Sequence, residues 1–509
     1  MGWWQWLRKN SLLLLILLVG LILYGYRLGL VPAGVYSDEA VVGYNAYSIL
    51  MTGRDEYGKL FPVYFKFFGT FTPGLFVYVQ ALVIRLLGLS VFSIRIISIV
   101  SMVVIAGLLA WFVYGTKLVK LSLVRELAAL LLLISPWAFL QGRVGYETTF
   151  ALMLLVLGIV LYRKPLWSFL FLSLSTYAGF TERYLAAMIG VLIIGIFYRE
   201  KNKWKALLMP TGVALFVQIP NFILMFTPAF WVKDSSYTVN FFGQYLSYFS
   251  PANLFYRSDY QLQRSIPELA VFYGWMFVPW IVGLYCLWQR RRLPIYQFII
   301  GLLLLSPLPA ALGNVNYSTQ RALPLLFPSM VIIIVGIEKI ITVVKRFYLL
   351  PLGVIVLIYS LIMLYRSYFI ILPAQRARAW DYGYESLALF IKQHPQTKFV
   401  IDNGRSVPYI ELLFFLKYPP KRYQADNPPV HQYYSNLSFS GNSMIGNAVV
   451  RSIIWREDLC KNVVLVGDPL AISDGQVQEH HLAKVWDVRD PEGTVLLRAF
   501  QTTQWQRCQ

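Results

Sequence analysis

The sequence predicts a polytopic α-helical membrane protein that ends in a small α/β domain outside the membrane. The chain has 509 residues, of which 57% are hydrophobic and only 14% are charged, whereas soluble domains carry about 25% charged residues. Apolar runs of about 20 residues, each long enough to cross a hydrocarbon core, recur from the N-terminus to Leu372. After Leu372 the composition becomes polar, with turn signals such as HPQ, YPPKRY and DPEG.

The apolar runs predict about eleven membrane-spanning helices. Arg8 and Lys9 precede the first run and no small-residue cleavage site follows it, so we expect an uncleaved span with a cytoplasmic N-terminus. The predicted spans are Ser11–Leu30, Phe92–Gly115, Val124–Leu140, Thr148–Tyr162, Leu166–Phe180, Leu185–Tyr198, Ala206–Phe226, Pro267–Trp288, Pro294–Leu312, Ala322–Ile341 and Leu349–Leu372.

The formal net charge of +20 is explained by short basic loops between the apolar runs, because cytoplasmic loops are enriched in Lys and Arg. No basic stripe or recognition motif for nucleic acid is present, and we exclude nucleic acid as a partner. The segment Thr72–Ser90 is apolar but short, and it contains Arg85. If it crossed the membrane, the basic loops that follow would move to the outside. We therefore predict a re-entrant or interfacial hairpin there.

This topology divides the chain into a transmembrane domain, residues 1–372, with a long first outer loop at 31–91, and an extracytoplasmic α/β domain, residues 373–509. Cys460 and Cys508 could pair in that last domain, whereas Cys286 lies in an apolar run and is expected to be packed. The elements predicted in the last domain are helices at Asp381–Gln393 and Val407–Leu416 and strands at Phe399–Asp402, Val463–Gly467 and Thr494–Phe500.

Ionisable side chains at the edges of spans are the candidate functional residues. Such a side chain costs about 2.5–3.5 kcal/mol at the middle of a membrane helix, so those that persist beside the membrane suggest a function. On the predicted outer side they come from several separate loops, and if they converge they form a polar cavity. They are Asp38, Glu39, Arg54, Asp55, Glu56, Lys59, Arg95, Arg143, Glu147, Glu182, Arg183 and Arg321.

Asp38 and Glu39 follow Ser37 in the segment GVYSDEAVVGYNAYS. One interpretation is capping, because Ser is a favoured N-cap and acids in a first helical turn complement the helix dipole. The other is catalysis, in which a carboxylate facing a membrane-bound substrate acts as a general base. In TGRDEYGKLFP, the mixed charges around two glycines are typical of a solvated turn, and a substrate contact by Arg54, Asp55 or Lys59 is the alternative.

The arginines have structural and functional interpretations of the same kind. Arg95, Arg183 and Arg321 could extend to lipid headgroups, or they could bind a phosphate, for which the planar guanidinium is suited. Arg143 and Glu147 are four residues apart and could pair on a helix. Alternatively, Glu147 is a ligand for substrate or metal and Arg143 orients it.

The order of motifs resembles the GT-C class of membrane glycosyltransferases, in the branch that contains protein O-mannosyltransferases and lipid A aminoarabinose transferases. The resemblance rests on SDEA, NAYSIL, TGRDEYGKLFP, FTPGLFVYVQALVIRLLGLSVFSIRIIS and SPWAFLQGRVGYETTFALMLL, within Tyr36–Leu161. It continues more weakly in NYSTQRALPLLFP, where Tyr317 and Arg321 lie.

This resemblance implies that a sugar moves from a polyprenyl-phosphate carrier to an acceptor on the outer face, with inversion at the anomeric carbon. Asp38 would be the catalytic carboxylate, with Glu39 beside it. Arg95 and Arg321 would contact the carrier phosphate. Glu147 stands where the family usually has Asp, which leaves its role and any divalent metal open. The implied partners are the lipid-linked donor, membrane lipid, and an acceptor that is a protein, a lipid or a cell-envelope glycan.

A polytopic transporter or lipid flippase is the alternative function, and a non-catalytic scaffold whose tail binds cell-wall material is a third. Transporters favour inverted repeats and charges near the bilayer midplane. Here the charges lie at outer span edges, and no internal repeat is visible in the sequence. We therefore expect a glycosyltransferase of the cell membrane with no certain cofactor.

Overall fold

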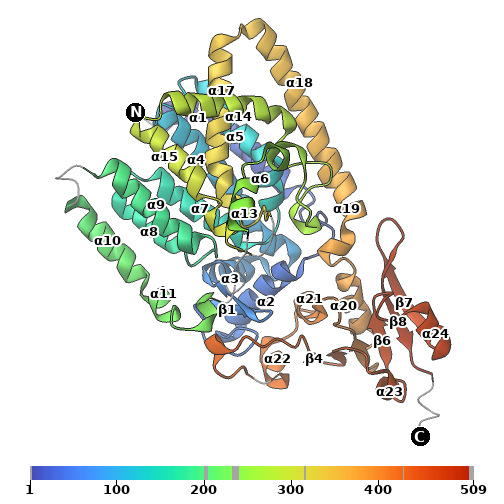
Figure 1. Cartoon of the computed structure of the whole chain (residues 1–509). Helices are drawn as coiled ribbons and strands as arrows, with labels where there is room; N and C mark the ends of the chain where they lie inside the picture. Colours follow the sequence, from blue (N-terminus) through green and yellow to red (C-terminus); the bar gives the residue numbers. More distant parts are fainter. Residues whose placement is uncertain (1–2, 200–204, 232–239, 314–316, 428, 504–509) are drawn as a thin grey trace. The chain divides into compact units, whose positions relative to one another are not determined.

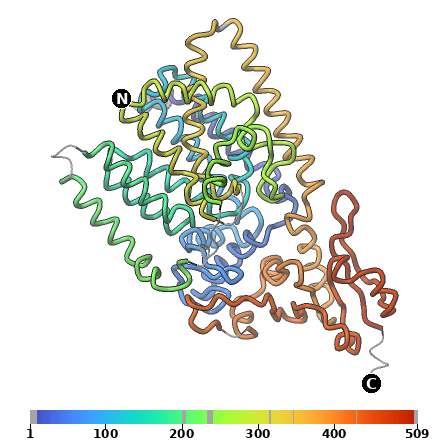
Figure 2. Tube along the Cα trace, viewed as in Figure 1, coloured from blue at the N-terminus to red at the C-terminus, as the bar shows by residue number. Residues whose placement is uncertain are grey.

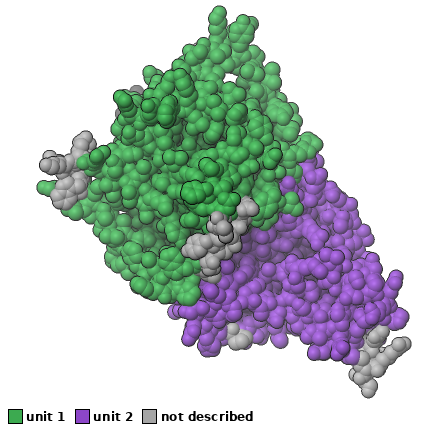
Figure 3. All heavy atoms as spheres, viewed as in Figure 1, with its two compact units in different colours: residues 1–28, 72–76, 95–369 green, residues 29–71, 77–94, 370–509 purple. Residues whose placement is uncertain are grey.

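The computed structural model describes residues 3–199, 205–231, 240–313, 317–427 and 429–503. The chain divides into two compact units, which Figure 3 distinguishes by colour. Unit 1 contains residues 1–28, 72–76 and 95–369, and unit 2 contains residues 29–71, 77–94 and 370–509. Most of the first outer loop, which the sequence assigned to the transmembrane domain, thus groups with the C-terminal residues.

The described secondary structure of unit 1 is almost entirely helical (Figure 1), apart from the end of one strand at residues 72–73. Several helices begin at a proline, which has a fixed φ and needs no hydrogen-bond partner in the first turn; examples are Pro165 and Pro294. The helices are α1 (Trp3–Gly25), α4 (Val91–Gly115, which begins in unit 2), α5 (Ser122–Ile134), α6 (Pro136–Gln141), α7 (Glu147–Val160), α8 (Pro165–Ser175), α9 (Glu182–Phe197), α10 (Lys205–Val217), α11 (Ile219–Leu224), α12 (Pro228–Trp231), α13 (Phe241–Ser247), α14 (Phe277–Gln289), α15 (Pro294–Leu305), α16 (Leu308–Ala311), α17 (Leu326–Val343) and α18 (Arg346–Tyr365).

Four described helical segments are long and apolar enough to cross a membrane: Val91–Gly115, Pro294–Ala311, Leu323–Val343 and Phe347–Gln375. The last of these follows a reversal of the chain after α17 (Figure 2). Only 11% of its most apolar stretch is buried within the protein, as expected for a helix whose side chains contact lipid. Other predicted spans coincide with shorter apolar helices, so the number of about eleven spans stays a prediction.

Helices α14 and α17 cross at two glycines. A Cβ atom on Gly336 would lie 1.8 Å from the carbonyl oxygen of Pro279, and one on Gly283 would lie 2.0 Å from that of Ile332. Small residues at such a crossing let two membrane helices approach closely, because association within lipid depends on van der Waals packing.

Substituting Gly336 by Leu is expected to lower the free energy of unfolding by at least about 1–3 kcal/mol, since the two backbones must separate. The measurement is the thermal unfolding temperature in detergent. Gly353 on α18 is the matched control, because no atom lies within 4 Å of a Cβ placed there. Equal unfolding temperatures for Gly336→Leu and Gly353→Leu would contradict the close crossing.

Unit 2 begins with α2 (Ser37–Thr52) and the paired strands β1 (Tyr64–Phe67) and β2 (Thr70–Pro73), followed by α3 (Leu75–Leu87); residues 72–76, at the end of β2 and the start of α3, belong to unit 1. The segment predicted as a hairpin, Thr72–Ser90, contains one helix, α3. Its 13 residues extend about 20 Å at 1.5 Å per residue, which is shorter than a hydrocarbon core of about 30 Å. Because a single helix occupies most of this segment, the predicted re-entrant or interfacial hairpin was wrong. Apolar residues alone do not specify a reversal of the chain.

The C-terminal part of unit 2 is an α/β domain around a six-stranded sheet. The strand order is β4-β5-β3-β6-β8-β7, with β3 parallel to β5 and β6 and the other pairs antiparallel. Phe399 lies in register with Ala448 on one side and Val464 on the other. The elements are α19 (Leu372–Gln375), α20 (Tyr384–Gln393), β3 (Phe399–Ile401), α21 (Pro408–Phe415), α22 (Pro420–Asp426), β4 (Ser443–Ile445), β5 (Ala448–Val450), α23 (Trp455–Asp458), β6 (Val464–Gly467), α24 (Asp474–Glu479), β7 (Ala483–Arg489) and β8 (Val495–Gln501).

All five elements predicted in this domain are present within a few residues of their expected ends. Cys286 is a buried free thiol in unit 1. The predicted pairing of Cys460 with Cys508 involves a residue, Cys508, that lies outside the described part of the chain.

Candidate active site

Two of the three predicted catalytic carboxylates, Asp38 and Glu39, lie in the first turn of α2, and the third, Glu147, begins α7. Glu39 is fully buried, and its Oε2 accepts a hydrogen bond of 3.3 Å from the backbone N–H of Tyr36. Asp38 is partly exposed. Tyr36 precedes the helix as its N-cap, so the prediction that Ser37 is the N-cap was wrong by one residue. The capping interpretation therefore applies to Glu39, and Asp38 is the more accessible acid for chemistry.

Two further acids belong to this region of unit 2, and the sequence had not singled them out. Asp381 Oδ2 accepts a hydrogen bond of 3.2 Å from the backbone N–H of Ser37. Withdrawal from water raises the pKa of Asp381 to about 7, and the charge of Asp38 acts in the same direction. Glu411 on α21 is buried, and burial, with the charges of Asp381 and Glu39, raises the pKa of its carboxyl well above the usual value.

Glu411 has a local sequence signal that could have indicated a special role: it is the one acid in the otherwise apolar helix PYIELLFF. Asp381 has no such signal. Its position beside Ser37 depends on contacts between segments 344 residues apart. The charge of Asp38 thus acts on Asp381, and that of Glu39 acts on Glu411.

The segment TGRDEYGKLFP is not uniformly a solvated turn. Arg54 and Lys59 are exposed, and Arg54 Nη1 donates to the carbonyl of Gly58 at 2.8 Å within the turn. Asp55 is fully buried, with Oδ1 accepting from the backbone N–H groups of Tyr57 and Lys59 and Oδ2 accepting from the hydroxyl of Tyr433. The solvated-turn prediction was therefore wrong for Asp55, because Tyr433 from the C-terminal part of unit 2 covers it.

Glu56, which is among the residues predicted from the sequence, and Lys66, which is not, complete a polar cluster in unit 2. Glu56 Oε1 accepts from the side-chain amide of Asn45 at 3.3 Å, while Oε2 has no hydrogen-bond partner among the described residues. Lys66 Nζ donates to Asn436 at 3.0 Å and lies 5.4 Å from the ring centre of Tyr57. Burial raises the pKa of Glu56 to about 8, and the charge of Asp55 adds to the increase.

The raised pKa of Glu56 predicts how the stability of unit 2 depends on pH. The folded chain holds a proton on Glu56 up to about pH 8, whereas the unfolded chain releases it near the ordinary glutamate pKa of 4.5. The free energy of unfolding should therefore fall as pH rises from about 4.5 to about 8. Glu56→Gln, which cannot ionise and keeps an acceptor for Asn45, should show a shallower fall and be more stable than the wild type above pH 8.

The measurement is the unfolding temperature as a function of pH for the wild type, Glu56→Gln and Glu492→Gln. Glu492 is an exposed acid in the same unit and serves as the control. A Glu56→Gln curve parallel to that of the wild type would show that Glu56 is ionised in the folded protein.

In unit 1, two predicted ligands of the substrate have clear structural partners. Arg95 is fully buried, and its Nη1 donates to the carbonyl of Leu28 at 3.0 Å. Arg143 is also fully buried, and its guanidinium donates to the carbonyls of Leu23, Tyr24 and Tyr26 at the end of α1. The aromatic rings around Arg143 are those of Phe139, Tyr368 and Phe369, at 5.0–5.4 Å.

Arg143 and Glu147 do not lie on one helix, so the predicted helical pair was wrong. Glu147 is the first residue of α7, and Arg143 lies in the preceding turn. Glu147 interacts electrostatically with another acid, Glu182, which is the first residue of α9. Arg183 stacks between the rings of Phe180 and Phe230 and donates to the carbonyl of Phe230 at 2.8 Å.

Arg321 and Tyr317 belong to a firmly held turn in unit 1. The Tyr317 hydroxyl donates to the carbonyl of Asn253 at 2.8 Å, and its ring stacks on Tyr248. Arg321 Nη1 lies 2.1 Å from the position that a Cβ on Gly313 would occupy, so a side chain at position 313 would displace this guanidinium.

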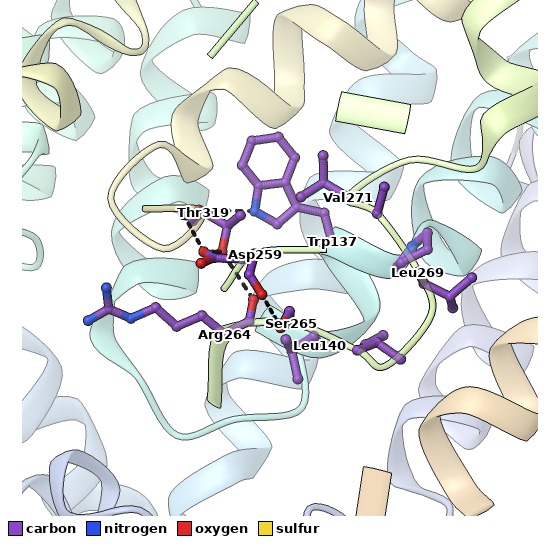
Figure 4. A pocket seen from close by; sticks show the side chains of 11 residues that line it. Trp137, Leu140, Asp259, Arg264, Ser265, Leu269, Val271 and Thr319 are labelled. Carbon is purple, nitrogen blue, oxygen red and sulfur yellow. Dashed lines mark hydrogen bonds between the residues drawn. The ribbon is translucent and has the colours of Figure 1, made fainter. Parts of the chain in front are cut away.

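Asp259 lines a small pocket and anchors the same turn (Figure 4). Its Oδ2 accepts from the backbone N–H and the hydroxyl of Thr319 at 3.1 and 2.9 Å. The indole N–H of Trp137 donates to the carbonyl of Thr319 at 3.0 Å. Arg264, whose Nη1 donates to Ser318 at 3.0 Å, extends away from the Asp259 carboxylate.

The predicted site residues thus divide between the two units. Unit 2 contains Asp38, Glu39, Arg54, Asp55, Glu56 and Lys59, whereas unit 1 contains the others. A single cavity shared by both groups stays a prediction. Within the described ranges, no group of three or more His, Cys, Asp or Glu side chains is arranged to hold a metal ion, and a divalent metal also stays a prediction.

The fold of the chain has counterparts among solved structures. ArnT from Cupriavidus metallidurans bound to undecaprenyl phosphate superimposes with a TM-score of 0.57 at 12% sequence identity, over 96% of this chain and 98% of that chain. Its apo state gives 0.54 at 13% identity with the same coverage. The fold is that of the GT-C class.

The GT-C fold includes a polytopic helical membrane part and a C-terminal domain, so the predicted fold class is confirmed in outline and the chain is a membrane protein. The apo oligosaccharyltransferase of Archaeoglobus fulgidus has a TM-score of 0.48 at 11% identity, over 99% of this chain and 76% of its own length. No family model matches the sequence, and a comparison with curated proteins finds no match. The likeness in fold thus rests on ArnT, at a sequence identity of 12–13%.

Proposed function

We propose that the protein is an integral-membrane glycosyltransferase that moves a sugar from a polyprenyl-phosphate carrier to an acceptor on the outer face, with inversion. The observation that carries this proposal is the likeness to ArnT bound to undecaprenyl phosphate, which extends over 96% of this chain and 98% of that chain. The Asp-Glu pair at the start of α2 supports it, because it places a partly exposed carboxylate on a rigid element just after the first apolar helix.

In this proposal Asp38 is the general base. It removes the proton from the acceptor hydroxyl while the oxygen of that hydroxyl forms a bond to the anomeric carbon. The bond between the anomeric carbon and the phosphate oxygen breaks through a transition state with oxocarbenium character, as in other glycosyl transfers. The negative charge that develops on the polyprenyl phosphate is stabilised by guanidinium groups, for which Arg95 and Arg321 are the candidates.

The remaining predicted residues are assigned by their contacts. Glu39 supports α2 through its hydrogen bond with the Tyr36 N–H, which leaves Asp38 as the reacting carboxylate. Glu147 is a second polar ligand for the substrate. Arg143 and Arg183 hold the framework in place through backbone carbonyls. The N-terminus is cytoplasmic, unit 2 is extracytoplasmic, and the acceptor is a protein, a lipid or a cell-envelope glycan.

The test uses purified protein in proteoliposomes that contain a polyprenyl-phosphate sugar with a radiolabelled sugar. Transfer of label to a co-reconstituted acceptor fraction, with release of polyprenyl phosphate, is the expected result. Movement of the labelled lipid between leaflets without release of polyprenyl phosphate would replace the proposal with the transporter or flippase alternative. Protein-free liposomes report the background of spontaneous hydrolysis.

A further inference from the structure

The segment before α2 is held by the residues at which the C-terminal domain begins. Gly34 has a φ of +96°, and a Cβ atom there would lie 2.1 Å from the carbonyl oxygen of Trp380. The Trp380 side chain is fully buried, and its ring contacts that of Tyr36 edge-on at 6.4 Å. Ser37 follows, and its N–H donates to Asp381. We name residues 380 and 381 the clamp.

The clamp supplies an acceptor that the helix itself lacks. The first N–H groups of a helix have no partner within the helix, and an acidic acceptor also complements the positive end of the dipole. Glu39 satisfies the N–H of Tyr36, and Asp381 satisfies that of Ser37. The two hydrogen bonds fix the backbone on the N-terminal side of Asp38, so they fix the direction in which its side chain leaves the helix.

We propose that Asp381 is a positioning residue for Asp38: its carboxylate holds the first turn of α2 through the Ser37 N–H and adds a negative charge beside the reacting acid. This inference rests on the proposed function, because it assigns Asp381 a role in the same transfer reaction. It makes the C-terminal domain part of the catalytic machinery.

The ionisation of Asp381 predicts a direction for the pH dependence. Its pKa is raised to about 7 by withdrawal from water. Above pH 7 the ionised carboxylate accepts a stronger hydrogen bond from Ser37, and its charge makes Asp38 a stronger base. The transfer rate should therefore rise between pH 6 and pH 8. The described titratable groups that act on this region are Asp38 and Glu39 of α2, Glu411 of α21 and Tyr384 of α20.

Two substitutions separate the hydrogen bond from the charge. Asp381→Asn keeps an oxygen that can accept from Ser37 and suits the left-handed backbone at this position, where φ is 50°. Asp381→Ala removes both the acceptor and the charge. Glu385→Gln is the matched control, since Glu385 is an exposed acid at the start of the neighbouring helix α20.

The experiment combines hydrogen exchange with transfer kinetics for full-length protein. In Asp381→Ala, the amides of residues 37–40 should exchange about tenfold faster, and kcat should fall by about 10²-fold, the size expected for a misplaced catalytic group, with KM within about twofold. In Asp381→Asn, exchange should stay near that of the wild type. Its kcat should exceed that of Asp381→Ala and lose the rise between pH 6 and pH 8. Glu385→Gln should behave like the wild type in both measurements.

Wild-type protein that transfers sugar, together with an Asp381→Ala variant of unchanged kcat, would overturn this inference and leave the proposed function intact. An Asp381→Asn variant that keeps the rise between pH 6 and pH 8 would also overturn the role of the charge. Absence of transfer by the wild type would instead remove the proposed function. The exchange measurement then still reports whether Asp381 holds the start of α2.

Discussion

Asp38→Asn is expected to lower the rate of sugar transfer by about 10²–10⁴-fold, the usual contribution of a general base. Asparagine has the same shape as aspartate but cannot take a proton from the acceptor hydroxyl. Asp38 is partly exposed in the first turn of α2, so the substitution buries no new polar group and should leave the unfolding temperature nearly unchanged. The measurement is single-turnover transfer from a labelled polyprenyl-phosphate sugar.

Glu39→Gln is the matched control for this prediction. Glutamine can accept the same hydrogen bond from the Tyr36 N–H, as Gln does in a capping box, so we expect transfer within about tenfold of the wild type if Glu39 serves the helix and Asp38 the reaction. Equal large losses in both variants would assign the chemistry to the pair. Full activity of folded Asp38→Asn would end the assignment of this residue as the base.

Arg143→Ala is expected to have the largest effect on stability, lowering the free energy of unfolding by about 3–5 kcal/mol. The guanidinium is fully buried and donates to three carbonyls at the end of α1. Hydrogen bonds from a charged donor contribute about 1.5–3 kcal/mol each, and a buried acceptor left unpaired adds a penalty. The measurement is thermal or denaturant unfolding in detergent.

Arg143→Lys is the informative companion, because it keeps the charge and loses the planar fork. A single ammonium group cannot reach three carbonyls in this geometry, so we expect the lysine variant to recover less than half of the lost stability. If Lys restores the wild-type unfolding temperature, the role of Arg143 is its charge. An Arg143→Ala variant as stable as the wild type and inactive would make this arginine a ligand of the substrate.

Local patterns along the chain were sufficient for part of this fold. The alternation and turn signals after Leu372 predicted β3, α21 and β6 to within a residue or two. Such elements depend on their own side-chain periodicity, with strands and helices placing apolar residues at different intervals. The same local information failed at Thr72–Ser90, where an apolar composition suited a hairpin and a single helix equally.

The sequence by itself thus determined that the protein is a membrane protein with a polar C-terminal domain, that an acid pair begins a helix, and that the order of motifs resembles the GT-C class. Only the tertiary structure decided which of those acids is available. Glu39 is buried against Tyr36, Asp55 is covered by Tyr433, and Ser37 meets an acid 344 residues away. The physical reason is that burial and pKa depend on which distant segments pack together, and that packing leaves no pattern in the neighbouring residues.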